Sequence, residues 1–312
     1  MTVGNSRNCH PMPESPFLAM VSYRRDGTAV MHYNEEATKC REPMQQLWLR
    51  VALALYSLGL LHGILTVVGR KQRVFRVALG AISLGAVFHL VALVEDGIAT
   101  QHFPVTTLQE AASLAAFLLA GSFLLVYWRY RFHSISVFVF PLIFVLTLAA
   151  AVGRGETYAG LPLLQTAWHY IHVPLIILGY TALFLTFVAG VMYLILEREL
   201  KSKKPRAFYH RLPPLETIDD LAYKSLTIGF PFITLGIISG ALWASSVWGP
   251  AWPLDPKIAF SFMTWLIYLS LVFARWSVGW RGRKAAYFAI AGFVAMLVTW
   301  GTNTGLHSFV SP

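Results

Sequence analysis

His89, His172 and His307, together with a Trp-rich segment at residues 248–257, are the residues whose types could carry out chemistry in this chain. A neutral imidazole nitrogen is a common metal ligand, and a Trp ring offers a flat aromatic face to a flat ligand. Because it is rich in Trp, Pro and Gly, the segment is unsuited to a helix across a bilayer and suits a loop at the membrane surface. It reads Trp248-Gly249-Pro250-Ala251-Trp252-Pro253-Leu254-Asp255-Pro256-Lys257.

The composition indicates a membrane protein. Of the 312 residues, 56% are hydrophobic and only 13% are charged, and the apolar residues form runs long enough to span a bilayer. A net charge of +10 is explained by basic cytoplasmic loops, so no nucleic-acid partner is expected. Cys9 and Cys40 both precede the first apolar run, and no CxxC motif occurs, which excludes a thiol-redox site.

The apolar runs predict an all-α fold, a polytopic integral membrane bundle of about eight transmembrane helices in a lipid bilayer. The expected spans are Leu47–Val68, Val74–Val94, Leu108–Tyr127, Ile135–Val152, His169–Leu196, Ser225–Val247, Ala259–Trp276 and Ala285–Thr302. Residues 1–43 are polar and contain four Pro, which predicts a disordered extension or upstream sequence ahead of a start at Met44. Residues 44–312 then form the transmembrane domain.

Basic residues decide the orientation. They gather after the first, third, fifth and seventh spans, and the positive-inside rule places these four loops in the cytoplasm. The alternate loops, at 95–107, 153–168 and 248–258, and the C-terminal tail carry few basic residues and are expected outside. No internal repeat of the kind found in transporters with inverted halves is clear, which argues against a secondary transporter for a small solute.

This topology brings His172, His307 and the Trp-rich loop to one outer surface. Two neutral imidazoles facing each other across a flat ring are how a protein holds six-coordinate haem iron. Trp248 and Trp252 would stack on the porphyrin, and Lys257 or Arg154 could neutralise its propionates. The alternative is that both His are interfacial polar residues with ordinary hydrogen bonds.

Other polar residues in or near the spans leave alternatives open. His89 lies inside the second span, where an ionisable group is costly and suggests a function. It is either part of a buried metal or haem site or a neutral His hydrogen-bonded to a neighbouring helix. His169 could substitute for His172 or hydrogen-bond near it. Glu110 could orient a His through a hydrogen bond.

Several segments, in order, resemble the haem-handling membrane proteins of cytochrome c assembly, the CcsA/ResC and CcmC group with a "WWD" loop. The resemblance covers most of the chain after Met44. The segments are His102-Phe103-Pro104 with Leu108 and Glu110, Trp168 through His172, Ile228-Gly229-Phe230-Pro231, Trp248-Gly249 with Trp252 and Asp255-Pro256-Lys257, Thr264-Trp265, and Gly305-Leu306-His307-Ser308.

The resemblance implies that His172 and His307 are the axial ligands of haem b bound in transit, with Trp248, Trp252 and Asp255 in the shelf beneath it. It also implies that His89 matches an intramembrane haem ligand. The expected location is the bacterial inner (cytoplasmic) membrane, with the loop facing the periplasm. The expected partners are apocytochrome c with a CxxCH motif and a ResB-like membrane subunit, so the chain is at most one subunit of a cytochrome c synthase.

The sequence departs from the family pattern at four positions. Leu254 replaces a Trp of the loop, Ile258 replaces a Glu, and Phe260 stands where a Trp is usual. Phe273 stands where the intramembrane partner of His89 is expected. These departures keep open a HemX-like accessory or regulatory function linked to haem synthesis, without haem transfer.

Overall fold

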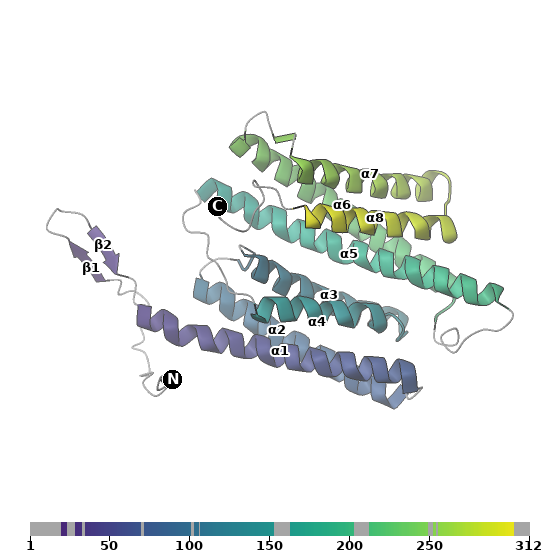
Figure 1. Ribbon diagram of the computed structural model, residues 1–312, viewed down its shortest axis with the longest axis horizontal. Helices are drawn as coiled ribbons and strands as arrows, with labels where there is room; N and C mark the ends of the chain where they lie inside the picture. The colour runs from purple at the N-terminus through teal and green to yellow at the C-terminus, as the bar shows by residue number, and fades with distance from the viewer. Residues whose placement is uncertain are drawn as a thin grey trace.

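The computed structural model describes residues 20–23, 29–32, 35–69, 72–100, 103–105, 107–152, 163–202, 212–248, 252–253 and 255–302. The bundle in this part of the chain is helical, which confirms the predicted fold class (Figure 1). Its helices are α1 Glu35–Gly69, α2 Gln72–Thr100, α3 Leu108–Tyr130, α4 Ser136–Val152, α5 Leu163–Lys201, α6 Leu215–Trp248, α7 Pro256–Ser277 and α8 Arg283–Gly301.

Each predicted span corresponds to one helix. Within the described residues, seven helices are long and apolar enough to cross a membrane, and α4 is the exception. With 17 residues, α4 would reach about 26 Å at 1.5 Å per residue, a little less than the hydrocarbon core of a typical bilayer. The chain is therefore a multi-pass membrane protein, whose described part has seven long helices and one shorter apolar helix.

The N-terminal segment contains a short hairpin among its described residues, and its predicted disorder stays a prediction. Strands β1 (Met20–Tyr23) and β2 (Ala29–His32) pair as an antiparallel hairpin, with Met20 opposite His32. Figure 1 shows this hairpin apart from the bundle. Helix α1 begins at Glu35 and passes through Met44 without a break. A domain boundary at residue 44 stays a prediction.

The eight helices form two groups of four, α1–α4 and α5–α8, drawn one below the other in Figure 1. In the first group α1 packs against α2 and α4, and in the second α5 packs against α6 and α8. Helix α5 joins the groups, since it contacts α3 and contributes side chains to the cores of both. Phe184 and Val188 lie in the core of the first group, whereas Leu183 lies in that of the second.

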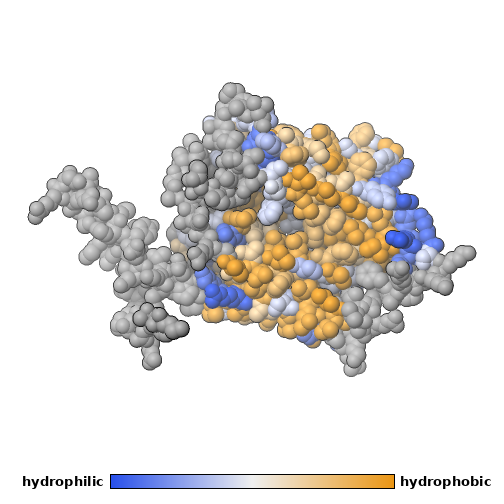
Figure 2. Space-filling view, in the orientation of Figure 1, coloured by the Kyte–Doolittle hydropathy of each residue, from blue (hydrophilic) through white to orange (hydrophobic). Residues whose placement is uncertain are grey.

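The outward face of the bundle is apolar. Leu125, Val145, Leu235 and Leu297 are more than half exposed, and Figure 2 shows the hydrophobic surface lying between hydrophilic ends. A water-soluble domain does not expose so large an apolar surface, whereas lipid tails cover it without cost. The surface agrees with the multi-pass assignment from helix length.

The helix ends that flank the connections rich in basic residues lie together at one end of the bundle. Figure 1 shows the α1–α2, α3–α4, α5–α6 and α7–α8 ends together on the right. We call this the inner end and the opposite one the outer end. Which end faces the cytoplasm stays a prediction of the positive-inside rule.

Candidate functional site

His172 lies in the outer part of α5, and its ring is tied to the backbone of α6. Its Nδ1 is 2.7 Å from the carbonyl oxygen of Gly236. A carbonyl can only accept a hydrogen bond, so Nδ1 carries the proton. In the neutral tautomer the lone pair is then on Nε2, the atom that a metal would bind. Metal-binding histidines commonly donate their other N–H to a backbone carbonyl in this way.

Glycines on α6 let α5 come this close. A Cβ on Gly236 would lie 2.6 Å from Cδ1 of Ile176, and one on Gly240 would lie 2.6 Å from Cε1 and 2.7 Å from Nδ1 of His172. Real Cβ atoms do not approach other atoms at such distances. Two small residues four apart present one bare stripe of helix backbone, against which a neighbouring helix can pack closely. The imidazole of His172 therefore packs on a glycine, and its orientation is set by helix packing.

The segment that follows His102 packs against the outer part of α5. Pro104 and Val105 are buried, and Val105 packs with Leu93 of α2, Leu114 of α3 and Ile177 of α5. Tyr170 and Val173, on either side of His172, lie against the same cluster. The outer ends of three helices are thus joined by one apolar contact next to His172.

Asp255 shapes the Trp-rich loop. Its side chain is buried and caps α7, because Oδ1 accepts from the backbone N–H groups of Lys257, at 2.8 Å, and Ile258, at 3.3 Å. Its own N–H donates to the carbonyl of Trp252, which lies in a short turn with Pro253 and is partly exposed. Asp255 therefore fixes the backbone where the loop meets α7, which is a structural role.

Several predicted site residues lie outside the described residues. These are His102, Arg154, Leu254 and His307, and the side chains of His169 and Trp248 are also not described. Helix α6 ends at Trp248, and α8 ends at Gly301, six residues before His307. The structure thus brings His172, Trp252 and Asp255 to the outer end, and the pairing of His172 with His307 stays a prediction.

His89 is completely buried in the first helix group, and both ring nitrogens are hydrogen-bonded. Nε2 lies 2.9 Å from Oγ of Ser113 on α3, and Nδ1 lies 3.3 Å from the hydroxyl of Tyr56 on α1. The ring of Phe117 approaches it edge-on, with ring centroids 5.9 Å apart. Of the two readings of His89, these contacts favour the neutral, hydrogen-bonded one, because an iron ligand would first have to give up one of the bonds.

Phe273 does not lie opposite His89. It is 65% exposed on the outward face of α7, in the second helix group, whereas His89 is enclosed in the first. A histidine at position 273 would face away from the bundle in this structure. The expectation that Phe273 occupies the place of a facing ligand for His89 is therefore not met.

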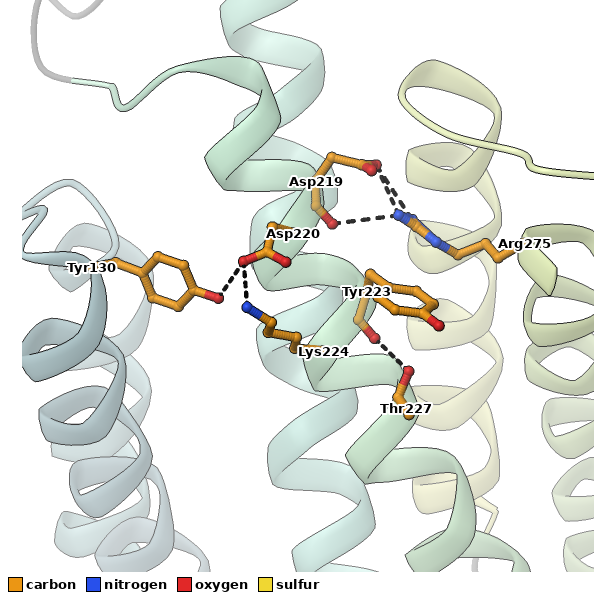
Figure 3. A network of polar contacts seen from close by, with 7 residues as sticks. All are labelled: Tyr130, Asp219, Asp220, Tyr223, Lys224, Thr227 and Arg275. Carbon is orange, nitrogen blue, oxygen red and sulfur yellow. Dashed lines mark hydrogen bonds and ion pairs between the residues drawn. The ribbon is translucent and has the colours of Figure 1, made fainter.

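A polar network at the inner end was not anticipated from the sequence (Figure 3). Arg275 of α7, whose side chain is 5% exposed, pairs with the carboxylate of Asp219 on α6 at 2.9 Å. The same carboxylate accepts the N–H of Gly282, which has a positive φ of 66° and lies against Tyr193. This partly buried ion pair thus fixes α6, α7 and the start of α8 together.

The neighbouring Asp220 links the two helix groups. It accepts hydrogen bonds from the Tyr130 hydroxyl of α3 and from Lys224, both at 2.8 Å (Figure 3). The Asp220–Lys224 spacing of four residues is a sequence signal for a helical ion pair. Its bond to Tyr130, 90 residues away in sequence, could not be found in that way.

These features describe a class of protein: a multi-pass helical membrane protein with a backbone-oriented histidine and a capped, Trp-containing loop at its outer end. The family described as "Cytochrome C assembly protein" matches residues 49–307. The chain belongs to this family, as its resemblance to the CcsA/ResC group predicted.

The chain is also similar to individual curated proteins named cytochrome c biogenesis protein CcsA. The one from Guillardia theta is 29% identical over 286 residues, covering 84% of this chain and 93% of the relative. The one from Prochlorococcus marinus (strain MIT 9301) is 30% identical over 267 residues, covering 77% of this chain and 86% of the relative. The similarity thus extends over most of the bundle and is not restricted to the Trp-rich loop.

Proposed function

We propose that this protein handles haem in cytochrome c biogenesis. It binds haem b in transit at the outer membrane face, with His172 and His307 as axial ligands and Trp248 and Trp252 stacked against the porphyrin. It then presents the haem to the CxxCH motif of apocytochrome c. Family membership and the name of the CcsA relatives support the process, and the geometry around His172 supports the site.

The observation that carries the proposal is the bond from His172 Nδ1 to the Gly236 carbonyl. It fixes one tautomer and one ring orientation before any ligand arrives, which reduces the entropy lost on binding. The ring also packs directly on Gly240, which leaves no room for a side chain between the ring and α6. Haem itself supplies the iron and the vinyl groups that become attached to the apocytochrome.

The remaining residues of the proposed site bind the haem and orient it. Asp255 holds the end of the loop and so positions Trp252, and Lys257, in the first turn of α7, would neutralise a propionate. The reduced thiols belong to the apocytochrome, because Cys9 and Cys40, the two cysteines of this chain, both precede the first apolar span, Gln46–Thr66. The protein acts with a ResB-like subunit in the bacterial inner membrane and is at most part of a synthase.

The test is spectroscopic and genetic. We expect the purified protein, expressed with ample haem, to show a low-spin Soret band that disappears in the double variant His172→Ala, His307→Ala. His62→Ala is a matched control, because this imidazole lies in α1 and contacts only the Leu58 carbonyl of its own helix among the bonds described. A wild-type protein without a Soret band would contradict the proposal. A haem-stained gel of a deletion strain, expected to lack holocytochrome c, tests the cellular role.

A HemX-like accessory role is the second candidate. Two observations favour it: the loop lacks an aromatic ring at Leu254, and both nitrogens of His89 are occupied by side-chain hydrogen bonds. This role predicts normal holocytochrome c in the deletion strain and a change in cellular haem content. The same gel therefore separates the two functions.

A further inference from the structure

The Gly236 carbonyl accepts two hydrogen bonds from side chains. One comes from His172 Nδ1, at 2.7 Å, and the other from the hydroxyl of Ser239, at 2.8 Å. Ser239 is 6% exposed, so its hydroxyl is shielded from solvent. One backbone oxygen is thus shared between the proposed haem ligand and a buried serine three residues along the same helix.

A serine that bonds back to its own helix is not unusual in this chain. Ser245 and Ser246, in the next two turns of α6, donate to the carbonyls of Leu242 and Trp243 at 2.9 and 2.7 Å. Both are exposed. What distinguishes Ser239 is its acceptor, because Gly236 is the residue that orients His172.

Sharing an acceptor has an electronic consequence. Besides its place in the α-helical ladder, the Gly236 carbonyl accepts from these two side chains, and each donor withdraws electron density from the oxygen. The oxygen then accepts the second hydrogen bond less strongly. For a metal-bound histidine, a stronger bond at Nδ1–H makes the ring a better electron donor through Nε2 and stabilises the ferric iron. The hydroxyl of Ser239 therefore limits how strongly His172 donates.

We infer that Ser239 is a positioning residue that acts through the shared Gly236 carbonyl to set the donor strength of His172 toward haem iron. The inference rests on the proposed function, because it requires His172 to be a ligand. A site that passes its cargo on needs an iron–histidine bond that can be broken again. Weakening the hydrogen bond behind His172 keeps that bond from becoming too strong.

The experiment compares Ser239→Ala with Ser245→Ala in the full-length, haem-loaded protein. Ser245→Ala removes the same kind of bond from the same helix without affecting Gly236. We expect both variants to keep the Soret band, and only Ser239→Ala to shift the haem midpoint potential to a more negative value. Ser239→Thr, which retains the hydroxyl, should restore the wild-type potential.

A second readout needs no haem. In the haem-free protein with ¹⁵N-labelled histidine, the Nδ1–H proton signal of His172 can be assigned by its loss in His172→Ala. We expect this signal to move downfield in Ser239→Ala, because the hydrogen bond to Gly236 becomes stronger, and to stay in place in Ser245→Ala.

The outcomes are separable. A wild-type protein without a Soret band overturns the proposed function and this inference with it. If haem binds but Ser239→Ala leaves both the potential and the proton signal unchanged, only the inference fails. The inference also fails if Ser239→Ala loses haem while the Nδ1–H signal of His172 stays in place. The hydroxyl would then be needed for haem binding and would not affect the donor strength of His172.

Discussion

Two imidazoles of this bundle, one in each helix group, have opposite surroundings. His89 is held by two side-chain hydroxyls and is sealed from all solvent. Nδ1 of His172 is hydrogen-bonded to a backbone carbonyl, and the ring packs on a glycine. A hydroxyl can donate or accept, so the contacts of His89 suit either neutral tautomer, whereas the carbonyl at His172 allows only one.

The comparison shows that burial alone does not identify a metal ligand. The hydrogen bonds of His89 satisfy both ring nitrogens within the core. The hydrogen bond of His172 fixes the proton on Nδ1 and so sets the orientation of the ring. On this comparison we propose His172 as the haem ligand and His89 as a structural residue. Four predictions test the distinction.

The largest effect is expected from removing each imidazole in turn. His172→Ala should abolish the bis-histidine Soret band, whereas His89→Ala should retain it in any protein that still folds. Added imidazole should partly restore the band in His172→Ala by entering the vacated ligand position. Haem content measured as the pyridine haemochrome gives the readout. Loss of haem in His89→Ala together with retention in His172→Ala would reverse the assignment.

The next effect concerns stability. His89→Leu leaves the hydroxyls of Tyr56 and Ser113 buried without their partner, which should lower the free energy of unfolding by about 3 kcal/mol. Adding Ser113→Ala should recover part of this loss, because it removes one of the two unsatisfied groups. Unfolding in detergent, followed by circular dichroism, provides the measurement. No change in His89→Leu would show that these hydrogen bonds do not stabilise the core.

A smaller effect is expected from the packing of His172. In Gly240→Ala the new Cβ collides with the ring and displaces it, so haem affinity should fall about tenfold, as for loss of other contacts that orient a ligand. Gly121→Ala is the matched control, because a Cβ there meets nothing within 4 Å. Haem titration of both variants tests this. Equal affinities would show that Gly240 does not orient the ligand.

The smallest effect is expected at Tyr56. Its bond to His89 is long, at 3.3 Å, so Tyr56→Phe should cost about 1 kcal/mol of stability. The Soret band should be unchanged, since the first helix group does not bind haem in this proposal. A Tyr56→Phe protein with normal stability but altered haem spectra would indicate that His89 contributes to the haem site after all.

Much of the scaffold could be predicted from the sequence because each span needs a long apolar run, and eight runs gave eight helices. The role of Asp255 also had a local signal. An Asp followed directly by Pro is typical of a helix N-cap with Pro in the first turn. Glycines four apart, such as Gly236 and Gly240, similarly indicate close helix packing in membranes.

Other features depend on contacts between distant residues. The partners of His89 are 24 and 33 residues away on other helices, and only the assembled bundle shows that they meet. The same holds for the Gly236 carbonyl, which is 64 residues from His172. The outward direction of Phe273 depends on where α7 packs. The periodicity of the sequence could not predict this direction, because α7 presents an apolar surface to lipid as well as to protein.

The cap at Asp255 has a consequence for how this protein can vary. Helix α6 ends at Trp248, and α7 starts at Pro256 with Asp255 as its N-cap. The cap needs only the carboxylate of Asp255 and backbone N–H groups, so other side chains can change without removing the start of α7.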